Sequence, residues 1–127
     1  MTTESANKQL IRRMVAEVFN AGRVELIDEL YVPKLTEGVK ALVTMLRSGF
    51  PDVTMEIEHL IEEGDKLACR WNVTGSHQGW FNGVPPTGVR AAWSGTSMYG
   101  VADGKIIVVL SNWDLYGLLR QLRAGMR

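Results

Sequence analysis

The hydrophobic period of the chain changes once, near its middle, and this change limits the possible folds most. Up to about residue 49, apolar residues such as Leu10, Met14 and Val18 recur at helical spacing. From residue 53 onward, apolar and polar residues alternate, which is typical of strands with one face in water. Helices followed by strands in 127 residues predict a single α+β domain spanning residues 1–127.

Turn signals divide the helical half into three segments. Gly22 fits the C-terminal cap of a first helix over 10–19, and Pro33 ends a short second helix over 26–31. A third helix, over 39–46, ends at a Gly-Phe-Pro-Asp turn. We therefore expect three helices before the first strand.

The second half predicts a meander of strands joined by tight turns. We expect strands over 53–62, 67–74, 89–99 and 105–113, followed by a short C-terminal helix over 115–122. Hairpin turns make neighbouring strands antiparallel. A twisted sheet of this size, curved over three N-terminal helices, leaves a cone-shaped hollow, so we expect an apolar pocket inside it.

The composition argues against several classes of partner. The formal net charge is zero, from 14 basic and 14 acidic residues, so neither nucleic acid nor an anionic membrane has a basic surface to bind. Apolar runs are too short to span a bilayer and the N-terminus is polar, which we interpret as a cytoplasmic location. Two distant histidines and the single Cys69 give no metal-ligand set, and no nucleotide-binding glycine motif follows a strand. We expect neither metal nor cofactor.

Several short motifs follow one another in a familiar order. They are Phe50-Pro51-Asp52, Glu63-Gly64-Asp65, Gly75-Ser76-His77-Gln78-Gly79, Gly83-Val84-Pro85-Pro86-Thr87-Gly88, Val101-Ala102-Asp103-Gly104-Lys105-Ile106 and Trp113-Asp114-Leu115-Tyr116-Gly117-Leu118-Leu119-Arg120-Gln121-Leu122. Each is an ordinary turn or cap by itself. Together they resemble the SnoaL-like polyketide cyclase family, within the superfamily shaped like nuclear transport factor 2 (NTF2-like).

The resemblance implies a cone-shaped α+β barrel, often dimeric, with its pocket inside the cone. It implies a cyclase of polyketide and antibiotic biosynthesis, which closes a ring by intramolecular aldol condensation without metal or cofactor. An aspartate near the end of the last strand is the family's acid/base, and Asp114 matches it. His77 matches the histidine of the Gly-x-His-x-Gly stretch.

Three residues are our candidates for catalysis. Aldol closure needs a base and then an acid, and Asp114 can be both in turn if Leu110 and Trp113 bury it and raise its pKa. The alternative for Asp114 is a helix N-cap. Asn112 shares its strand face and could hold an enolate oxygen, or simply anchor backbone. His59 lies on the apolar face of its predicted strand, where it could protonate a carbonyl or orient a phenol. The alternative is a core histidine with satisfied hydrogen bonds, or one at the open end of the sheet.

A second set of residues is expected to bind the substrate. It consists of Trp71, Trp93, Trp113, His77, Trp80, Phe81, Tyr99 and Arg70. The three strand tryptophans either line the pocket or fill a large core. Trp80 and Phe81 form either a lid or a plug, His77 lies at the cone mouth or in a polar turn, and strand parity does not decide where Arg70 and Tyr99 point.

The leading hypothesis is a cofactor-independent enzyme that closes a ring, or moves a proton next to a carbonyl, in an aromatic polyketide-like substrate. The alternative is an accessory protein that binds such a molecule without catalysis, for example beside an oxygenase. Two features keep it open: the short connection 31–36 carries no histidine, and the stretch 108–110 is wholly apolar. A third hypothesis is a structural dimer module, and a homodimer is expected under all three.

Overall fold

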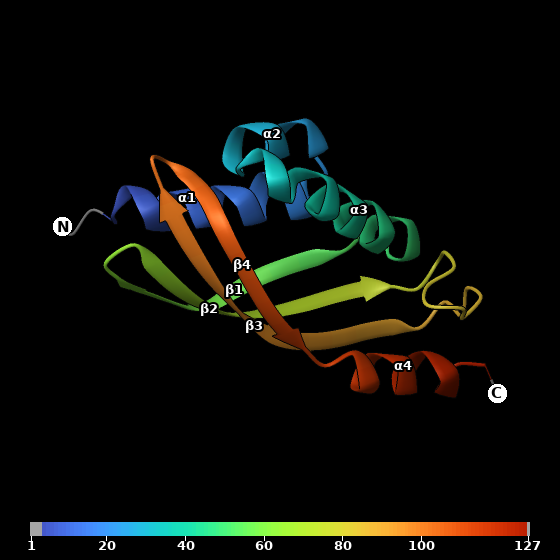
Figure 1. Ribbon diagram of the computed structural model, residues 1–127. Helices are drawn as coiled ribbons and strands as arrows, with labels where there is room; N and C mark the ends of the chain where they lie inside the picture. The colour runs from blue at the N-terminus through green and yellow to red at the C-terminus, as the bar shows by residue number, and fades with distance from the viewer. Residues whose placement is uncertain (1–3, 127) are drawn as a thin grey trace.

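Two layers make up residues 4–126, the part of the chain that the computed structural model describes. Helical segments from the first half of the chain lie over one face of a four-stranded antiparallel sheet (Figure 1). The last helix, α4, lies by itself near the far end of β3 and β4 (Figure 1). The expected α+β architecture, with three N-terminal helices over a curved sheet, is confirmed.

The first helix has two parts. Helix α1 (Ala6–Arg13) begins at Ser5, whose Oγ accepts a hydrogen bond from the Lys8 amide at 3.1 Å. It runs without a break into η1 (Met14–Asn20), a π-helical stretch that buries Met14, Val15 and Val18. The chain then turns at Gly22, whose φ of +73° is favourable for glycine.

The second and third helices meet at Pro33. A short 3₁₀ turn, η2 (Val24–Leu26), leads into α2 (Ile27–Leu30). Helix α3 (Pro33–Gly49) begins with the proline in its first turn, so it is longer than the segment 39–46 that the sequence pattern predicted. Proline suits this position because the first helical amides have no partner within the helix.

The sheet is a simple meander in the order β1-β2-β3-β4. Its strands are β1 (Thr54–Glu63), β2 (Lys66–Ser76), β3 (Arg90–Ala102) and β4 (Lys105–Trp113), and α4 (Leu115–Ala124) follows. The register shifts between Ile57 and His59 in β1 and between Gly100 and Val101 in β3. Such bulges increase local twist, which helps the sheet curve around the helices.

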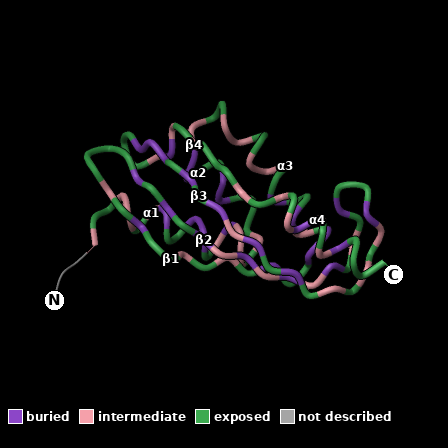
Figure 2. The backbone as a smooth tube through the Cα atoms, turned by 90° about the horizontal axis from the view of Figure 1, so that it is seen from below, coloured by how far each residue is buried: buried purple, intermediate pink, exposed green. Residues whose placement is uncertain are grey.

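The two faces of this sheet differ sharply in burial. On β3, for example, Ala91, Trp93, Gly95, Ser97 and Tyr99 are buried, whereas the residues between them are exposed or intermediate. The alternation is visible along the strands in Figure 2. The inner face packs on η1, α2 and α3 to form the core, so side chains on alternate strand positions belong to different environments.

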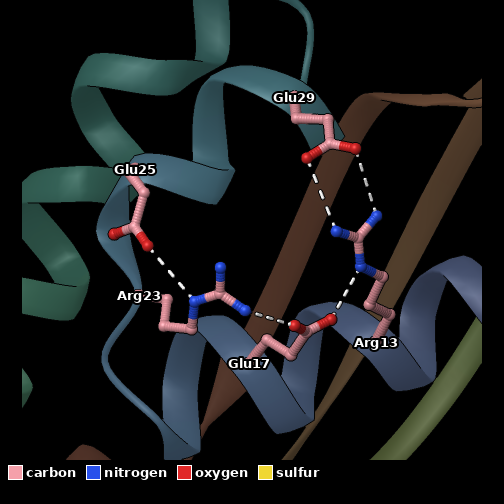
Figure 3. Close-up of polar contacts among 5 residues, drawn as sticks. All are labelled: Arg13, Glu17, Arg23, Glu25 and Glu29. Atoms are coloured by element: carbon pink, nitrogen blue, oxygen red, sulfur yellow. Dashed lines mark hydrogen bonds and ion pairs between the residues drawn. The ribbon is translucent and has the colours of Figure 1, made fainter.

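A surface network of ion pairs joins η1 to the η2–α2 segment (Figure 3). Arg13 binds Glu17 at 2.7 Å and Glu29 at 3.3 Å, and Arg23 binds Glu17 at 2.7 Å and Glu25 at 3.2 Å. Exposed pairs contribute little singly, on the order of 0 to 1 kcal/mol each. Because Arg13 bridges two helical segments, the network helps to fix the helices that cover the sheet.

Candidate functional site

A cavity lies between the helices and the inner face of the sheet. The empty space inside it and at its mouth is about 640 Å³, and this value includes open solvent outside the enclosed part. Its lining residues come from η1, α3, all four strands and the α2–α3 connection: Phe19, Tyr31, Val39, Leu42, Leu46, Met55, Trp71, Val73, Trp93, Ser97, Tyr99, Val109, Ser111 and Trp113. Only Leu42 and Ser111 of this set are exposed, so the opening lies between α3 and β4.

Aromatic rings form much of the wall. Trp71, Trp93 and Trp113 project from three neighbouring strands, and the rings of Trp93 and Trp113 lie 6.5 Å apart. Phe50, behind them, packs on Trp93 at 5.0 Å between ring centroids. Such walls provide large apolar contact area with few rotatable bonds, and suit a planar apolar guest.

Hydroxyl groups supply the polar part of the wall. The Trp71 indole Nε1–H donates to Ser97 Oγ at 2.9 Å, and Ser97 Oγ shares a hydrogen bond with Ser111 Oγ at 2.7 Å. Tyr31 and Tyr99 also line the cavity. Burial raises the pKa of Tyr99 to about 12 and raises that of Tyr31 further above the ordinary phenol range. Both phenols are therefore neutral O–H donors near pH 7.

No charged side chain takes part in this wall. Among the cavity-lining residues within 4–126, none is Asp, Glu, His, Lys or Arg. The cavity is consequently neutral, and its only proton donors are hydroxyl and indole groups. That chemistry can orient and polarise an oxygen atom of a ligand, whereas a proton-abstracting base has to come from elsewhere.

Asp114, our candidate acid/base, lies outside this cavity. Its carboxylate caps α4 by accepting the Gly117 amide at 2.8 Å, and its own amide donates to the Ser94 carbonyl at 3.1 Å. The expected burial of Asp114 is wrong, because the residue is exposed and Leu110 is 64% exposed on the outer face. The cap geometry is the alternative that the sequence left open.

Asn112 and Arg70 lie with Asp114 on the outer side of the sheet. They line a shallow, open groove together with Ser94, Gly95, Thr96 and Trp113. Arg70 donates to Ser94 Oγ at 3.0 Å there. Among the described residues, Trp113 alone borders both this groove and the inner cavity, whereas Asp114 and Asn112 border only the groove.

His59 was expected on an apolar strand face, and this is wrong. The register shift after Ile57 places two residues, Glu58 and His59, where a regular strand has one. The alternation is thereby reversed: His59 points outward with its side chain 69% exposed, and Leu60 turns inward instead.

His77 is fully buried in the loop after β2. Its Nδ1 accepts the Thr87 amide at 3.2 Å and lies 2.9 Å from Thr87 Oγ1, which assigns the ring proton to Nε2. Within residues 4–126, Nε2 is buried with no partner that meets hydrogen-bond geometry, and the ring packs on Phe50 at 5.4 Å. His77 does not line the cavity. Burial lowers its pKa, because the charged imidazolium loses hydration.

Trp80 and Phe81 lie in different environments and do not form one lid. Phe81 is 2% exposed and packs edge-on against Phe50 at 5.2 Å. Trp80 is 68% exposed to solvent. Phe81 is therefore a plug that closes this end of the core, and neither residue lines the cavity.

Sequence reasoning missed the two serines and Tyr31. Ser97 shares strand parity with Trp93 and Tyr99, and Ser111 shares it with Trp113, so alternation alone could have placed both beside the chosen aromatic residues. Helical spacing with Leu26, Ile27 and Leu30 predicted that Tyr31 turns inward, but it did not predict a place on the cavity wall. Tyr31 lies in the connection between α2 and α3, where it forms a bridge with Ile106 of β4.

Two further properties bear on the kind of site. Among residues 4–126, no three His, Cys, Asp or Glu side chains come close enough together to hold a metal ion. Within the same described range, none of the helices combines the length and apolar character of a membrane span.

Solved structures with the same architecture cover almost the whole chain. TsrD from Streptomyces laurentii superposes with a TM-score of 0.87 at 25% identity, over 98% of this chain and 99% of that one. IdmH from Streptomyces antibioticus, proposed to be a polyketide cyclase, gives 0.82 at 27% identity over 92% and 98%. AclR from Streptomyces galilaeus, proposed to be a hydroxylase, gives 0.84 at 28% over 92% and 84%.

No curated protein matches the chain in sequence. The family model described as SnoaL-like polyketide cyclase matches residues 9–122, from the first helix to α4. That span includes every element that forms the cavity, and the solved structures share its curved sheet and covering helices. The chain belongs to the SnoaL-like polyketide cyclase family and has its NTF2-like fold.

Proposed function

We propose that this protein binds a small aromatic, polyketide-like molecule in the inner cavity and promotes ring closure or proton transfer next to one of its carbonyl groups. The observation that carries the proposal is the neutral aromatic cavity, with hydroxyl donors along one wall and an opening between α3 and β4. Membership of the cyclase family and the likeness to IdmH support the reaction class.

The aldol reaction needs three things: an oriented substrate, a hydrogen-bond donor to the attacked carbonyl, and a base. The cavity residues can supply the first two. The aromatic walls can hold the rings of the substrate so that its reacting carbons approach each other. Neutral hydroxyls can donate to the carbonyl that gains negative charge. Both tasks need no cofactor. Proton abstraction needs a base, and Asp114, in the adjacent groove, remains our prediction for it.

A second candidate function is an accessory protein that binds the molecule without transforming it. The specific observation in its favour is the neutral lining, which contains no carboxylate, imidazole or amine among the described residues. The likeness to AclR, proposed to be a hydroxylase, also supports a role beside an oxygenation step.

Two neighbouring valines of β4 give a matched test of the cavity. Val109 lines it, whereas Val108 is 42% exposed on the outer face. We expect Val109→Trp to fill the cavity and abolish binding of the bicyclic ketone 1-tetralone, measured by calorimetry. Val108→Trp should bind like wild type. Equal binding by both variants would remove the inner cavity from the proposal.

Turnover separates the two candidate functions. Purified protein is incubated with a series of aromatic β-dicarbonyl compounds, and ring closure is followed by chromatography and mass spectrometry. Acceleration that is lost in Val109→Trp supports the cyclase. Tight binding of these compounds with no acceleration of any of them would leave the accessory role.

A further inference from the structure

The first step of the hydrogen-bond chain on the cavity wall has a direction that its atoms impose. An indole N–H only donates, so Ser97 Oγ must accept from Trp71 at 2.9 Å. Ser97 is 4% exposed, and its oxygen lies 2.7 Å from that of Ser111. Trp71 is therefore a buried donor that is linked through the buried Ser97 hydroxyl to Ser111 at the opening of the cavity, and either serine can donate to the other.

The chain of three side chains has one more polar hydrogen than its hydrogen bonds use. Trp71, Ser97 and Ser111 bring three polar hydrogens, and the two hydrogen bonds between them use two. When Ser97 donates to Ser111, the free proton is on Ser111. In the reverse arrangement it is on Ser97, which also faces the Tyr99 hydroxyl and can pass the donor role to it. Either way a hydroxyl proton of a cavity-lining residue, on Ser111, Ser97 or Tyr99, has no hydrogen-bond partner within residues 4–126.

The outward arrangement, in which Ser97 donates to Ser111, places its free donor where a ligand can reach it. Each hydroxyl that accepts a hydrogen bond becomes a better donor, so a head-to-tail chain from Trp71 polarises the Ser111 hydroxyl. Ser111 is also the exposed member of the chain, at the opening of the cavity, where an entering ligand meets it first.

We propose that Ser111, polarised through Ser97 by Trp71, binds a carbonyl or enolate oxygen of the ligand and thereby selects oxygen acceptors among apolar ring compounds. The inference rests on the proposed function, because it requires that the inner cavity is the ligand site. It adds the part of the ligand that is recognised and the residue that recognises it. Because no Lys or Arg of residues 4–126 lines the cavity, the donor chain is also what would stabilise negative charge developing on that oxygen.

Two probes of the same skeleton test the inference. 1-Tetralone carries a ketone where tetralin carries a methylene group, so the pair isolates the oxygen acceptor. We expect Ser111→Ala to lower the affinity for 1-tetralone by about three- to tenfold, which corresponds to one net hydrogen bond. The affinity for tetralin should not change. Ser111→Thr, which keeps the hydroxyl, should restore ketone affinity.

The matched control is Ser94→Ala, on the outer face of β3, which should change neither affinity. Infrared spectroscopy gives a signature that altered packing would not produce: the carbonyl stretch of bound 1-tetralone should rise in frequency in Ser111→Ala. If Ser111→Ala lowers the affinity for both probes equally, or for neither, the proposed role of Ser111 is overturned while the cavity proposal survives. Failure of wild type to bind either probe would overturn both.

Discussion

The two faces of one sheet carry different chemistry, although the same four strands build both. On β3, Trp93, Ser97 and Tyr99 turn inward to the neutral cavity, whereas Ser94 and Thr96 turn outward. The inner face holds aromatic rings and hydroxyls without charge. The outer face carries the charged groups, and with them most of the residues that the sequence suggested for catalysis. A residue's chemical type therefore says less about the site than its strand parity does.

The outer face also has an apolar part. Ile61, Ala68, Met98 and Leu110 are register partners across all four strands, and all are exposed. The next row comprises His59, Arg70, Thr96 and Asn112. An uncovered apolar row beside a polar row of mixed character is typical of an interaction surface. The inner face is covered by helices of the same chain, and the outer face has no such cover within residues 4–126.

Adjacent residues of β3 give the largest expected contrast between the faces. A Cβ on Gly95 would lie 2.5 Å from the Trp71 ring and 2.6 Å from the Asn112 carbonyl oxygen. Backbone cannot move away cheaply, so we expect Gly95→Ala to lower the free energy of unfolding by on the order of 3 kcal/mol. Urea denaturation of the variant and of wild type measures this difference in the free energy of unfolding.

The control for Gly95 is its neighbour. Ser94 lies on the outer face, and its hydroxyl bonds only an exposed arginine, so Ser94→Ala should change stability by less than about 0.5 kcal/mol. Equal stabilities of the two variants would show that the inner face has more freedom to repack than these contacts imply.

The second contrast concerns a homodimer, which we predict to form through the outer face. Arg70 and Glu58 lie together there, so two copies related by a twofold axis can pair opposite charges around the apolar row. Leu110→Glu places an unpaired charge in that row twice per dimer. We expect the dimer dissociation constant to rise about 100-fold, equal to about 2.7 kcal/mol, by analytical ultracentrifugation.

Affinity for 1-tetralone should be unchanged in Leu110→Glu, since the inner face is untouched. Val24→Glu, which adds the same charge on the helical side, is the control and should dimerise normally. A strictly monomeric wild type, or a dimer that survives Leu110→Glu, would contradict the prediction.

Much of the fold was predictable because each half of the chain repeats one local rule. Helical spacing in residues 6–49 and alternation in residues 54–113 correctly predicted the helices, the four strands and their order. The extent of α3 was harder to predict, because the run from Pro33 has little apolar periodicity before Val39. Proline gave two signals at once, ending one helix and beginning the next.

The site was only partly predictable, because strand alternation tells which residues share a face but not which face turns inward. Trp71, Trp93 and Trp113 do line the cavity, as their size favoured, and Tyr99, whose direction strand parity left open, lines it too. His59 was placed wrongly because one extra residue at a bulge reverses the alternation, and no local sequence signal marks it. Asp114 lies just past the end of β4, where the strand rule no longer applies and the helix takes its side chain as a cap.

His77 offers a contrast between a buried and an exposed histidine. Burial lowers its folded-state pKa below the ordinary value of about 6.5, so the unfolded chain binds the proton more readily. The stabilising contribution is therefore complete above about pH 6.5 and is lost as the pH falls toward the folded-state pKa. One proton limits the slope to about 1.4 kcal/mol per pH unit.

Unfolding by urea between pH 5 and 7.5 measures this slope. We expect His77→Gln to flatten it, and His59→Gln, which alters an exposed side chain on the outer face, to keep the wild-type profile. Parallel profiles for wild type and His77→Gln would show that another group causes the pH dependence.

The smallest effect is expected at Asp114, where two substitutions separate its two possible roles. Asparagine keeps a side-chain oxygen that can accept the Gly117 amide, whereas alanine keeps none. We expect Asp114→Ala to lower stability by about 1 kcal/mol and Asp114→Asn by less than half of that.

Any kcat for a β-dicarbonyl substrate should then be compared between wild type and Asp114→Asn, which should keep the cap but has no carboxylate. A large fall in kcat there would make Asp114 the base and require the substrate to reach past Trp113. An unchanged kcat would restrict Asp114 to capping α4 and leave the inner hydroxyls as the groups that act on the ligand.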